Sequence, residues 1–228
     1  MSAPAPPVSE EELCSRARAI AGLSLAELAA DLGRSLPGDP RRAKGFVGQL
    51  VETALGASAG SLPEPDFQLI GVELKTLPVG AHGRPTESTY VCTLPLEHDA
   101  GPTRWRESNV RRKLDRVLWV PVEAARELPV ASRRVGSAIL WSPSAEEDAR
   151  LRADWEELTD MVVMGRVAEI TAHQGTCLQV RPKAADSRAR RWGVDEQGRR
   201  VRTLPRGFYL RASFTRAILE ARYAGLAR

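Results

Sequence analysis

Residues 67–78, with the sequence FQLIGVELKTLP, are the stretch that decides the fold. Apolar and polar residues alternate around Gly71, which predicts two short β-strands broken at that glycine. The preceding segment, GASAGSLPEPD at residues 56–66, has the glycine, serine and proline content of a loop. Because side chains alternate across a strand, Glu73 and Lys75 are expected to point to the same side. The stretch therefore predicts a strand pair that carries charged groups on one face.

The rest of the chain predicts further strands and a set of helices. Strands are predicted at residues 88–96, 116–123, 137–142, 177–183 and 207–213. Helices are predicted at residues 9–22, 24–33, 46–55, 146–164 and 214–223. Because strands cluster between residues 67 and 142 with helices around them, we expect an α/β fold with a mixed central β-sheet flanked by helices. Residues 1–8, with three prolines, are expected to be a disordered N-terminal arm, and residues 9–228 a single domain with two lobes around a cleft.

The composition argues against several classes of protein. No apolar run approaches the roughly 18 residues of a transmembrane helix, and the N-terminus lacks the basic start and apolar core of a secretory signal. The three cysteines are far apart and form no C-x-x-C pair, which argues against structural zinc and disulfides. Buried free thiols in a reducing compartment are expected, and hence a cytoplasmic protein.

Basic residues gather in two parts of the chain, although the net charge is only +4. Residues 181–211 contain ten basic and three acidic residues, and residues 104–116 contain six basic and two acidic ones. Segregated basic stretches can present a positive face to phosphates. Solvated surface arginine is the alternative, and charge alone leaves both interpretations open.

The candidate catalytic motif of the chain consists of Asp66, Glu73 and Lys75. If the two predicted strands pair, Asp66 meets Glu73, and two carboxylates and one ammonium group converge. Carboxylate oxygens are ligands that Mg²⁺ prefers, and such a metal activates water and offsets charge on a phosphate. Lys75 can then orient the attacking water or stabilise the developing negative charge. The pattern resembles the PD-(D/E)xK nuclease motif, but an edge strand with alternating exposed charges would read the same way.

Longer stretches of the chain resemble the MutH family of mismatch-repair nucleases. The resemblance begins with KGFVGQLVETALGASAGSLPEPDFQLIGVELKTLPV at residues 44–79 and runs in order over nearly the whole chain. It continues through RRVGSAILWSP, DWEELTDMVVMG, QVRPKAA and TLPRGFYLR. A restriction-endonuclease-like fold, with two lobes around a DNA-binding cleft, is what the resemblance implies.

The resemblance also implies roles for individual residues. Asp66 and Glu73 correspond to the metal-binding carboxylates of the family and Lys75 to its catalytic lysine. The remaining catalytic positions are Glu52, which completes the acidic cluster, and Lys113, near the scissile phosphate. The DNA-binding positions are Tyr90, Arg181, Lys183 and Tyr209, the last as a sensor of the adenine methyl group. From the residues alone, the aromatic pair would equally fit core packing, Glu52 a solvated helix position, and the two cations a surface strand end.

The function that the resemblance implies is a nick in the unmethylated strand at hemimethylated GATC sites. The expected cofactor is Mg²⁺, with Mn²⁺ as a substitute, and the expected state is a monomer. The expected partners are duplex DNA and an activating MutL protein, with MutS and a helicase in the same pathway. Two alternatives are a type II restriction enzyme that cuts both strands at GATC and a non-catalytic DNA-binding module of the same fold. The arginine-rich segment at residues 187–202 resembles a mobile loop, and the sequence leaves open whether it contacts DNA phosphates.

Overall fold

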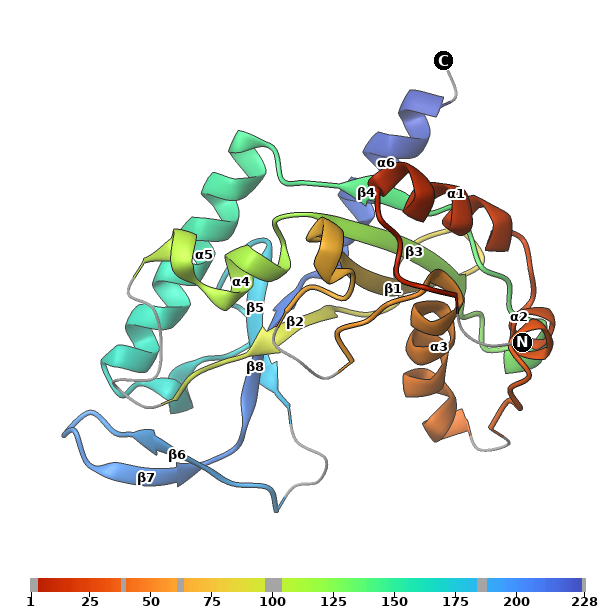
Figure 1. Ribbon diagram of the computed structural model, residues 1–228. Helices are drawn as coiled ribbons and strands as arrows, with labels where there is room; N and C mark the ends of the chain where they lie inside the picture. Colours follow the sequence, from red (N-terminus) through yellow and green to blue (C-terminus); the bar gives the residue numbers. More distant parts are fainter. Residues whose placement is uncertain (1–3, 38–39, 61–63, 97–103, 184–187, 227–228) are drawn as a thin grey trace. The chain divides into compact units, whose positions relative to one another are not determined.

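The computed structural model describes residues 4–37, 40–60, 64–96, 104–183 and 188–226 (Figure 1). The chain divides into two compact units. The first comprises Met1–Glu87, Asp115–Ser142 and Leu219–Arg228, and the second comprises Ser88–Leu114 and Pro143–Ile218. Both units are therefore assembled from segments that are distant in the sequence.

The first unit is built on a mixed three-stranded sheet. Strand β1 (Glu73–Val79) pairs in parallel with β3 (Val117–Glu123), and β3 pairs antiparallel with β4 (Ile139–Trp141). The middle strand, β3, is almost entirely apolar and buried. A continuous hydrophobic run of this kind is typical of a strand that is covered on both faces. The α/β fold and its mixed sheet confirm the sequence prediction.

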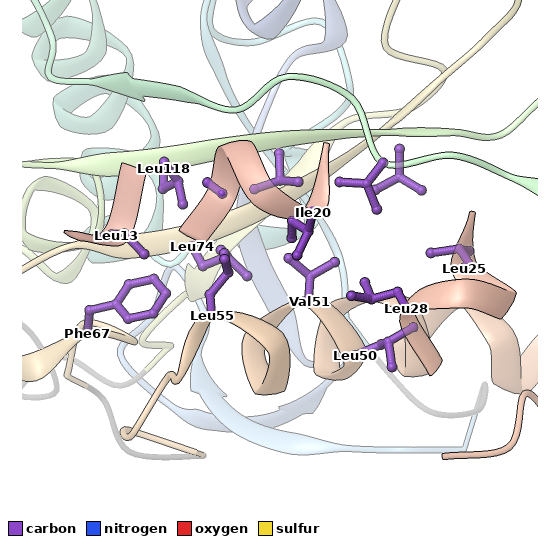
Figure 2. Close-up of a cluster of buried hydrophobic side chains, with 14 of the residues drawn as sticks. Leu13, Ile20, Leu25, Leu28, Leu50, Val51, Leu55, Phe67, Leu74 and Leu118 are labelled. Carbon is purple, nitrogen blue, oxygen red and sulfur yellow. The ribbon is translucent and has the colours of Figure 1, made fainter. Parts of the chain in front are cut away.

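Three helices pack their apolar sides into the core of the first unit. They are α1 (Glu10–Ile20), α2 (Leu25–Asp31) and α3 (Pro40–Leu55). The Ser24 hydroxyl accepts the Glu27 N–H, and the Glu27 carboxylate accepts the Ser24 N–H, which fixes the start of α2. Figure 2 shows the buried cluster in which side chains from all three helices meet the sheet; its labelled members are Leu13, Ile20, Leu25, Leu28, Leu50, Val51, Leu55, Phe67, Leu74 and Leu118.

The prediction of two strands broken at Gly71 is wrong in its first half. Residues Gln68–Ile70 form the short 3₁₀ helix η1, and Gly71 follows it with a φ of 67°. The Phe67 N–H donates to the Val72 carbonyl over 2.9 Å, which closes the turn with one isolated bridge. Gly71 adopts this left-handed conformation without the Cβ clash that other residues meet. Asp66 therefore lies in a loop before a tight turn, and only β1 is a strand.

The second unit contains a separate antiparallel sheet. Strand β8 (Arg206–Leu210) lies in the middle, between β2 (Thr89–Thr93) and β5 (Leu178–Pro182) (Figure 1). The predicted strand at residues 88–96 thus does not extend the sheet of the first unit, contrary to the expectation of one central sheet. Alternation identifies a strand but not its partner, and here the partner comes from the far end of the chain.

Helix α5 (Ala145–Val163) packs against β5 in the second unit. A capping box between Ser144 and Glu147 begins the helix. The helix carries the buried Asp154, whose carboxylate accepts the backbone N–H groups of Thr176, Cys177 and Leu178 over 2.8, 2.6 and 2.8 Å. These bonds fix the position at which β5 begins.

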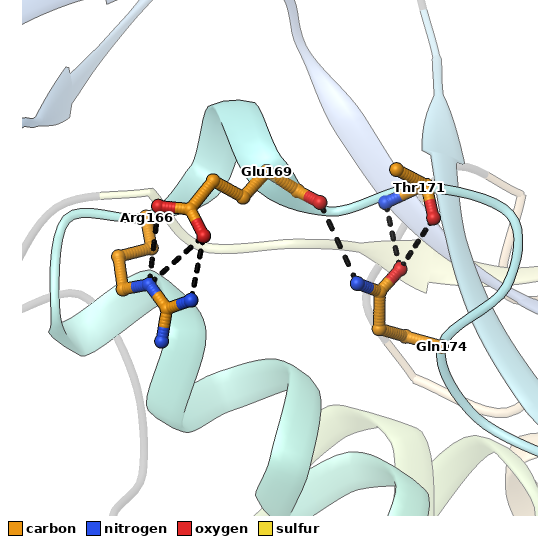
Figure 3. Close-up of polar contacts among 4 residues, drawn as sticks. All are labelled: Arg166, Glu169, Thr171 and Gln174. Atoms are coloured by element: carbon orange, nitrogen blue, oxygen red, sulfur yellow. Dashed lines mark hydrogen bonds and ion pairs between the residues drawn. The ribbon is translucent and has the colours of Figure 1, made fainter.

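The connection from α5 to β5 is ordered by short-range polar contacts. It contains η4 (Val167–Glu169). Figure 3 shows that Arg166 pairs with Glu169, and that the Gln174 carboxamide oxygen accepts both the N–H and the hydroxyl of Thr171. The connection is therefore a defined turn that leads into β5.

The remaining elements of the second unit include a two-stranded hairpin. Its strands are β6 (Arg191–Val194) and β7 (Arg200–Thr203). The segment expected as a mobile loop at residues 187–202 is thus a β-hairpin within its described part, while Ser187 lies outside the described residues. The other elements, in both units, are η2 (Trp105–Glu107), α4 (Asn109–Lys113), η3 (Val130–Ser132) and α6 (Ala212–Leu226).

The N-terminal residues differ from the predicted disordered arm. The first three residues of the arm lie outside the described residues. In the part that the structure describes, the Ala5 carbonyl accepts a hydrogen bond from Arg16 over 2.6 Å, and the Val8 N–H donates to Glu12. Residues 4–8 are tied to α1 because these backbone groups find specific partners there.

Two further expectations concern the cysteines and the membrane. Cys14, Cys92 and Cys177 are free thiols, and Cys177 alone is fully buried, which raises the pKa of its thiol. None of the helices in the described ranges has the length and apolar character needed to cross a bilayer.

Candidate active site and nucleic-acid interface

Glu73 and Lys75 point to the same side of β1, as their spacing predicts. The Lys75 Nζ lies 2.5 Å from Glu73 Oε1, and the two side chains are only 14% and 4% exposed. Two charges at this depth have lost most of their hydration, so each depends on the other for compensation. The ion pair therefore places a carboxylate and an ammonium group together at the start of the strand.

Asp66 reaches the same strand from the loop before η1. Its Oδ2 atom accepts the N–H of Leu74 over 2.8 Å. The backbone carbonyl of Asp66 accepts N–H groups from Ser58 and Ala59, which tie the loop to the residues after α3. Asp66 thus arrives beside Glu73 through a turn and a side-chain-to-backbone bond, and not through the predicted strand pair.

Glu52 brings a third carboxylate from α3. Burial raises its pKa, as do the charges of Asp66 and Glu73, while Lys75 opposes the shift. A Cβ on Gly48 would lie 3.9 Å from Glu52 Oε1 and 3.9 Å from Thr76 Oγ1. The glycine therefore leaves space where the Glu52 carboxylate adjoins β1. Of the two interpretations of Glu52, the solvated helix position is the one that this geometry disfavours.

The first unit thus brings together Glu52, Asp66, Glu73 and Lys75. Among the residues described here, no group of three or more His, Cys, Asp or Glu side chains already has the arrangement of a metal site. The donors are nevertheless of the kind that a hard divalent cation prefers, since the charges of Asp66 and Glu73 both act on the Glu52 carboxyl and Lys75 pairs with Glu73. Burial is the main reason that the pKa of Glu52 is raised, and repulsion from Asp66 and Glu73 adds to it; a bound cation would offset that repulsion.

In the second unit, Tyr90 and Tyr209 face each other across β2 and β8. They are register partners, and their ring centroids lie 5.3 Å apart in an edge-on arrangement. The Tyr90 hydroxyl shares a hydrogen bond with the Thr93 hydroxyl over 2.9 Å. Both rings are half-buried, so they are neither core residues nor fully solvated.

Two cations of β5 and its end lie over these rings. Lys183 Nζ is 4.4 Å from the centroid of Tyr90, and the Arg181 guanidinium is 6.0 Å from the centroid of Tyr209. Both cationic side chains are exposed. The sheet therefore presents two aromatic rings and two positive charges on one face, which is a combination suited to nucleic acid.

Gly207 and Gln179 belong to this face, and the sequence prediction missed both. A Cβ on Gly207 would lie 2.8 Å from Tyr90 Cε2, so only glycine leaves room for the ring. Gln179 is buried, pairs with Tyr209 in the register and donates to the Ser88 hydroxyl over 2.6 Å. The signal for Gln179 was a lone amide in an apolar strand, two residues before Arg181.

Lys113 ends the short helix α4 in the second unit. It is half-buried and follows Arg111, which pairs with Asp148 over 2.8 Å. Its expected place near the scissile phosphate stays a prediction.

Comparisons with known proteins agree with the family resemblance. Residues 55–154 match the family model described as DNA mismatch repair enzyme MutH. A DNA mismatch repair protein MutH of Yersinia enterocolitica is 54% identical over 220 residues, which cover 96% of each chain. The same-named proteins of Salmonella paratyphi C and Vibrio cholerae are 56% and 53% identical over 218 residues, covering 96% of this chain and 94% and 98% of theirs. Identity at this level over nearly the full length of these relatives shows that the chain belongs to the MutH family of DNA mismatch repair endonucleases.

Proposed function

We propose that this endonuclease nicks the unmethylated strand of DNA at hemimethylated GATC sites, with Mg²⁺ as its cofactor. The convergence of Glu52, Asp66 and Glu73 on Lys75 is the observation that carries the proposal. Hydrolysis of a phosphodiester needs negative oxygen ligands for a metal and a cation near the phosphate. Asp66, Glu73 and Lys75 follow one another in the order of the PD-(D/E)xK motif, and the charge of each acts on the Glu52 carboxyl.

Asp66 and Glu73 are the residues that would hold the metal, and Glu52 would complete the acidic cluster. Mg²⁺, or Mn²⁺ in its place, supplies a Lewis acid that activates water and offsets charge on the phosphate. The Leu74 N–H holds Asp66 Oδ2 in position, and the burial of Glu73 excludes competing solvent. Preorganised ligands of this kind need little rearrangement when the substrate arrives.

Lys75 and Lys113 would act on the phosphate from their separate elements. The Lys75 ammonium already donates to Glu73 Oε1, so it lies where it would donate to a phosphate oxygen that gains negative charge. Lys113 would provide a second positive charge close to the scissile phosphate.

The tyrosine-bearing sheet of the second unit would recognise the DNA. Arg181 and Lys183 would contact DNA phosphates or bases, and Tyr90 would lie near the DNA beside them. Tyr209 would sense whether the adenine carries a methyl group. The edge-on contact with Tyr90 would hold the Tyr209 ring at one angle.

The proposed partners follow from the family. Activation would come from a MutL protein after MutS detects a mismatch, and a helicase would unwind from the nick. The enzyme would act as a cytoplasmic monomer, because one nick needs one active site.

A plasmid-nicking assay with Mg²⁺ at low salt tests the proposal. It compares unmethylated, hemimethylated and fully methylated GATC, each with and without MutL. Nicks restricted to unmethylated strands and stimulated by MutL are the expected result. Linear plasmid without MutL would indicate a type II restriction enzyme instead, and GATC binding without cleavage in Mg²⁺ or Mn²⁺ would indicate a non-catalytic module.

A further inference from the structure

Gln179 is a buried polar side chain beside Tyr209 in the sheet of the second unit. Strand β8 lies between β2 and β5 (Figure 1), and Tyr209 of β8 pairs with Tyr90 on one side and with Gln179 on the other. Register partners in antiparallel strands share a face, so the three side chains form one row across the sheet. Tyr209 therefore has an aromatic neighbour on β2 and a carboxamide neighbour on β5.

The Gln179 side chain is bonded across β8 to the far strand. Its Nε2 atom donates to the Ser88 hydroxyl over 2.6 Å, and Ser88 directly precedes β2. Ser88 lies two residues before Tyr90, so its side chain is on the face that carries the row. Neighbouring strands are about 4.8 Å apart, so the two side chains together span about 10 Å. This Gln179–Ser88 strap thus passes over β8 beside Tyr209.

The surroundings of Tyr209 limit its ring on several sides. The Tyr90 ring meets it edge-on at 5.3 Å, and the Arg181 guanidinium lies 6.0 Å from its centroid. Directly opposite residues have Cβ atoms about 4.5–5.5 Å apart, so Gln179 bounds the space on the β5 side. A glutamine side chain has several staggered rotamers, and the bond to Ser88 selects one of them. The strap therefore fixes one wall of the space that the ring occupies.

Gln179 supports another residue and is poorly placed to read a base itself. A glutamine that reads adenine uses both ends of its carboxamide on N6 and N7. Gln179 is 5% exposed, and its amino group already donates to Ser88. Tyr209 is half-buried and shares its face with the exposed Arg181. Tyr209 is thus the member of the pair that a ligand can reach.

We propose that Gln179 is a positioning residue for Tyr209 and sets how sharply the enzyme distinguishes methylated from unmethylated adenine. The Gln179–Ser88 strap holds the Tyr209 ring against Tyr90, so that one methyl group is enough to change the fit. Recognition on this scale needs side chains held within about 0.5 Å of the working geometry. The inference rests on the proposed methyl-sensing role of Tyr209 and assigns the residues that support it.

The first test measures a discrimination ratio with the full-length chain, Mg²⁺ and MutL. The ratio is the nicking rate of the unmethylated strand divided by that of the methylated strand, with each strand of a hemimethylated GATC duplex labelled separately. Gln179→Met removes the donor at similar volume, and Ser88→Ala removes the acceptor. Each is expected to lower the ratio by about 2- to 12-fold, the range that the net contribution of one hydrogen bond gives. The double variant should fall no further than the larger single effect, because both changes break the same bond.

Two control variants separate the strap from general effects of substitution. Ser88→Thr keeps a hydroxyl at this position and should restore the wild-type ratio. Gln174 accepts the Thr171 hydroxyl over 2.8 Å, which is a second glutamine–hydroxyl bond of this unit (Figure 3). Because it lies in the connection before β5 and outside the sheet, Gln174→Met should leave the ratio unchanged. Circular dichroism checks that each variant is folded.

A second measurement observes the ring of Tyr209 without DNA or cleavage. The chain contains three tyrosines, so labelling with ¹³C-tyrosine gives few ring signals to assign by NMR. In Ser88→Ala and Gln179→Met, the Tyr209 signals are expected to shift and its ring to flip faster, because one wall is no longer fixed. Tyr223 belongs to the first unit, and its signals should not change.

Specific outcomes would overturn the inference. Wild-type ratios in both single variants, or unchanged Tyr209 signals, would show that the strap does not position the ring. A fall in Gln179→Met that Ser88→Ala lacks would indicate that Gln179 contacts the adenine directly, which also contradicts the strap. A wild-type chain that nicks both strands alike would refute methyl sensing and this inference with it. A discriminating wild type with unaffected variants would refute the inference alone.

Discussion

Replacing Asp154 with alanine removes the group that fixes the start of β5. The carboxylate accepts three backbone N–H groups, and those of Cys177 and Leu178 are buried. In the alanine variant both amides lose their acceptor in a place that water does not reach. The strand that carries Gln179, Arg181 and the approach to Lys183 then loses its anchor.

The expected cost follows from those bonds. A buried donor left without a partner costs about 1–3 kcal/mol, so the two buried amides together predict a destabilisation of about 2–6 kcal/mol. The third amide, at Thr176, adds little because its residue is exposed to water. Asp154→Asn keeps one acceptor oxygen and the side-chain volume, and is expected to cost about half as much.

Urea unfolding followed by tryptophan fluorescence measures the effect. Trp155 is adjacent to Asp154 and lies 5.8 Å from Trp105 between ring centroids, so part of the signal comes from this unit. With a typical m value of about 2 kcal/mol per molar urea, the midpoint of Asp154→Ala falls by about 2 M. Asp160→Ala, on an exposed position of the same helix, is expected to stay within about 0.5 kcal/mol of wild type.

The reasoning would be refuted by equal stabilities of the two alanine variants. A loss below about 1 kcal/mol for Asp154→Ala would mean that the amides find other partners or water. An asparagine variant as unstable as the alanine variant would show that charge, and not acceptor geometry, is what stabilises the connection.

Four other predictions concern the two candidate sites. Glu73→Ala should abolish cleavage while DNA affinity stays within about threefold, measured by plasmid nicking and anisotropy; wild-type cleavage would exclude its catalytic role. Because the pKa of Glu52 is raised in the folded chain, the metal-free protein should be most stable, as far as Glu52 is concerned, below the ordinary carboxyl pKa of 4.5, and should lose this stability as pH rises above it. Glu52→Gln should flatten the dependence of Tm on pH, and an unchanged profile would contradict this. Gly207→Ala should cost about 1–3 kcal/mol by displacing the Tyr90 ring, whereas Gly45→Ala, with open space in α3, should stabilise by up to about 1 kcal/mol in thermal unfolding. Tyr209→Ser should relax the discrimination against methylated adenine in the nicking assay, and unchanged discrimination would remove Tyr209 from that role.

Much of the fold follows from local pattern. The capping boxes of Ser24 and Ser144, and the alternation within β1, are features that a few neighbouring residues determine. Glu73 and Lys75 share a side for the same reason. Which strands pair with each other could not be predicted in the same way. Strand β2 pairs with β8, and the residues of β2 do not specify that partner.

Asp66 reaches β1 by a route that differs from the predicted one. A strand pair was expected to bring Asp66 to Glu73, but a 3₁₀ turn at Gly71 and one bond to the Leu74 N–H do so. Whether a three-residue 3₁₀ turn forms depends on which backbone groups find hydrogen-bond partners, and the alternation of apolar and polar residues gives no information about this. The position of Glu52 beside the strand depends on how α3 packs against β1, which the pattern of residues along the helix does not determine.

The order of strands also constrains how the protein can fold as it is synthesised. The middle strand of the second sheet, β8, is the last strand of the chain, and its Leu210 pairs with Thr89 of β2. A nascent chain that ends before β8 leaves both β2 and β5 with open edges, which are prone to pair with other chains. Pairing over such sequence separation is slow because the intervening loop must close first. Completion of the tyrosine-bearing sheet thus occurs only after residues 206–210 have left the ribosome.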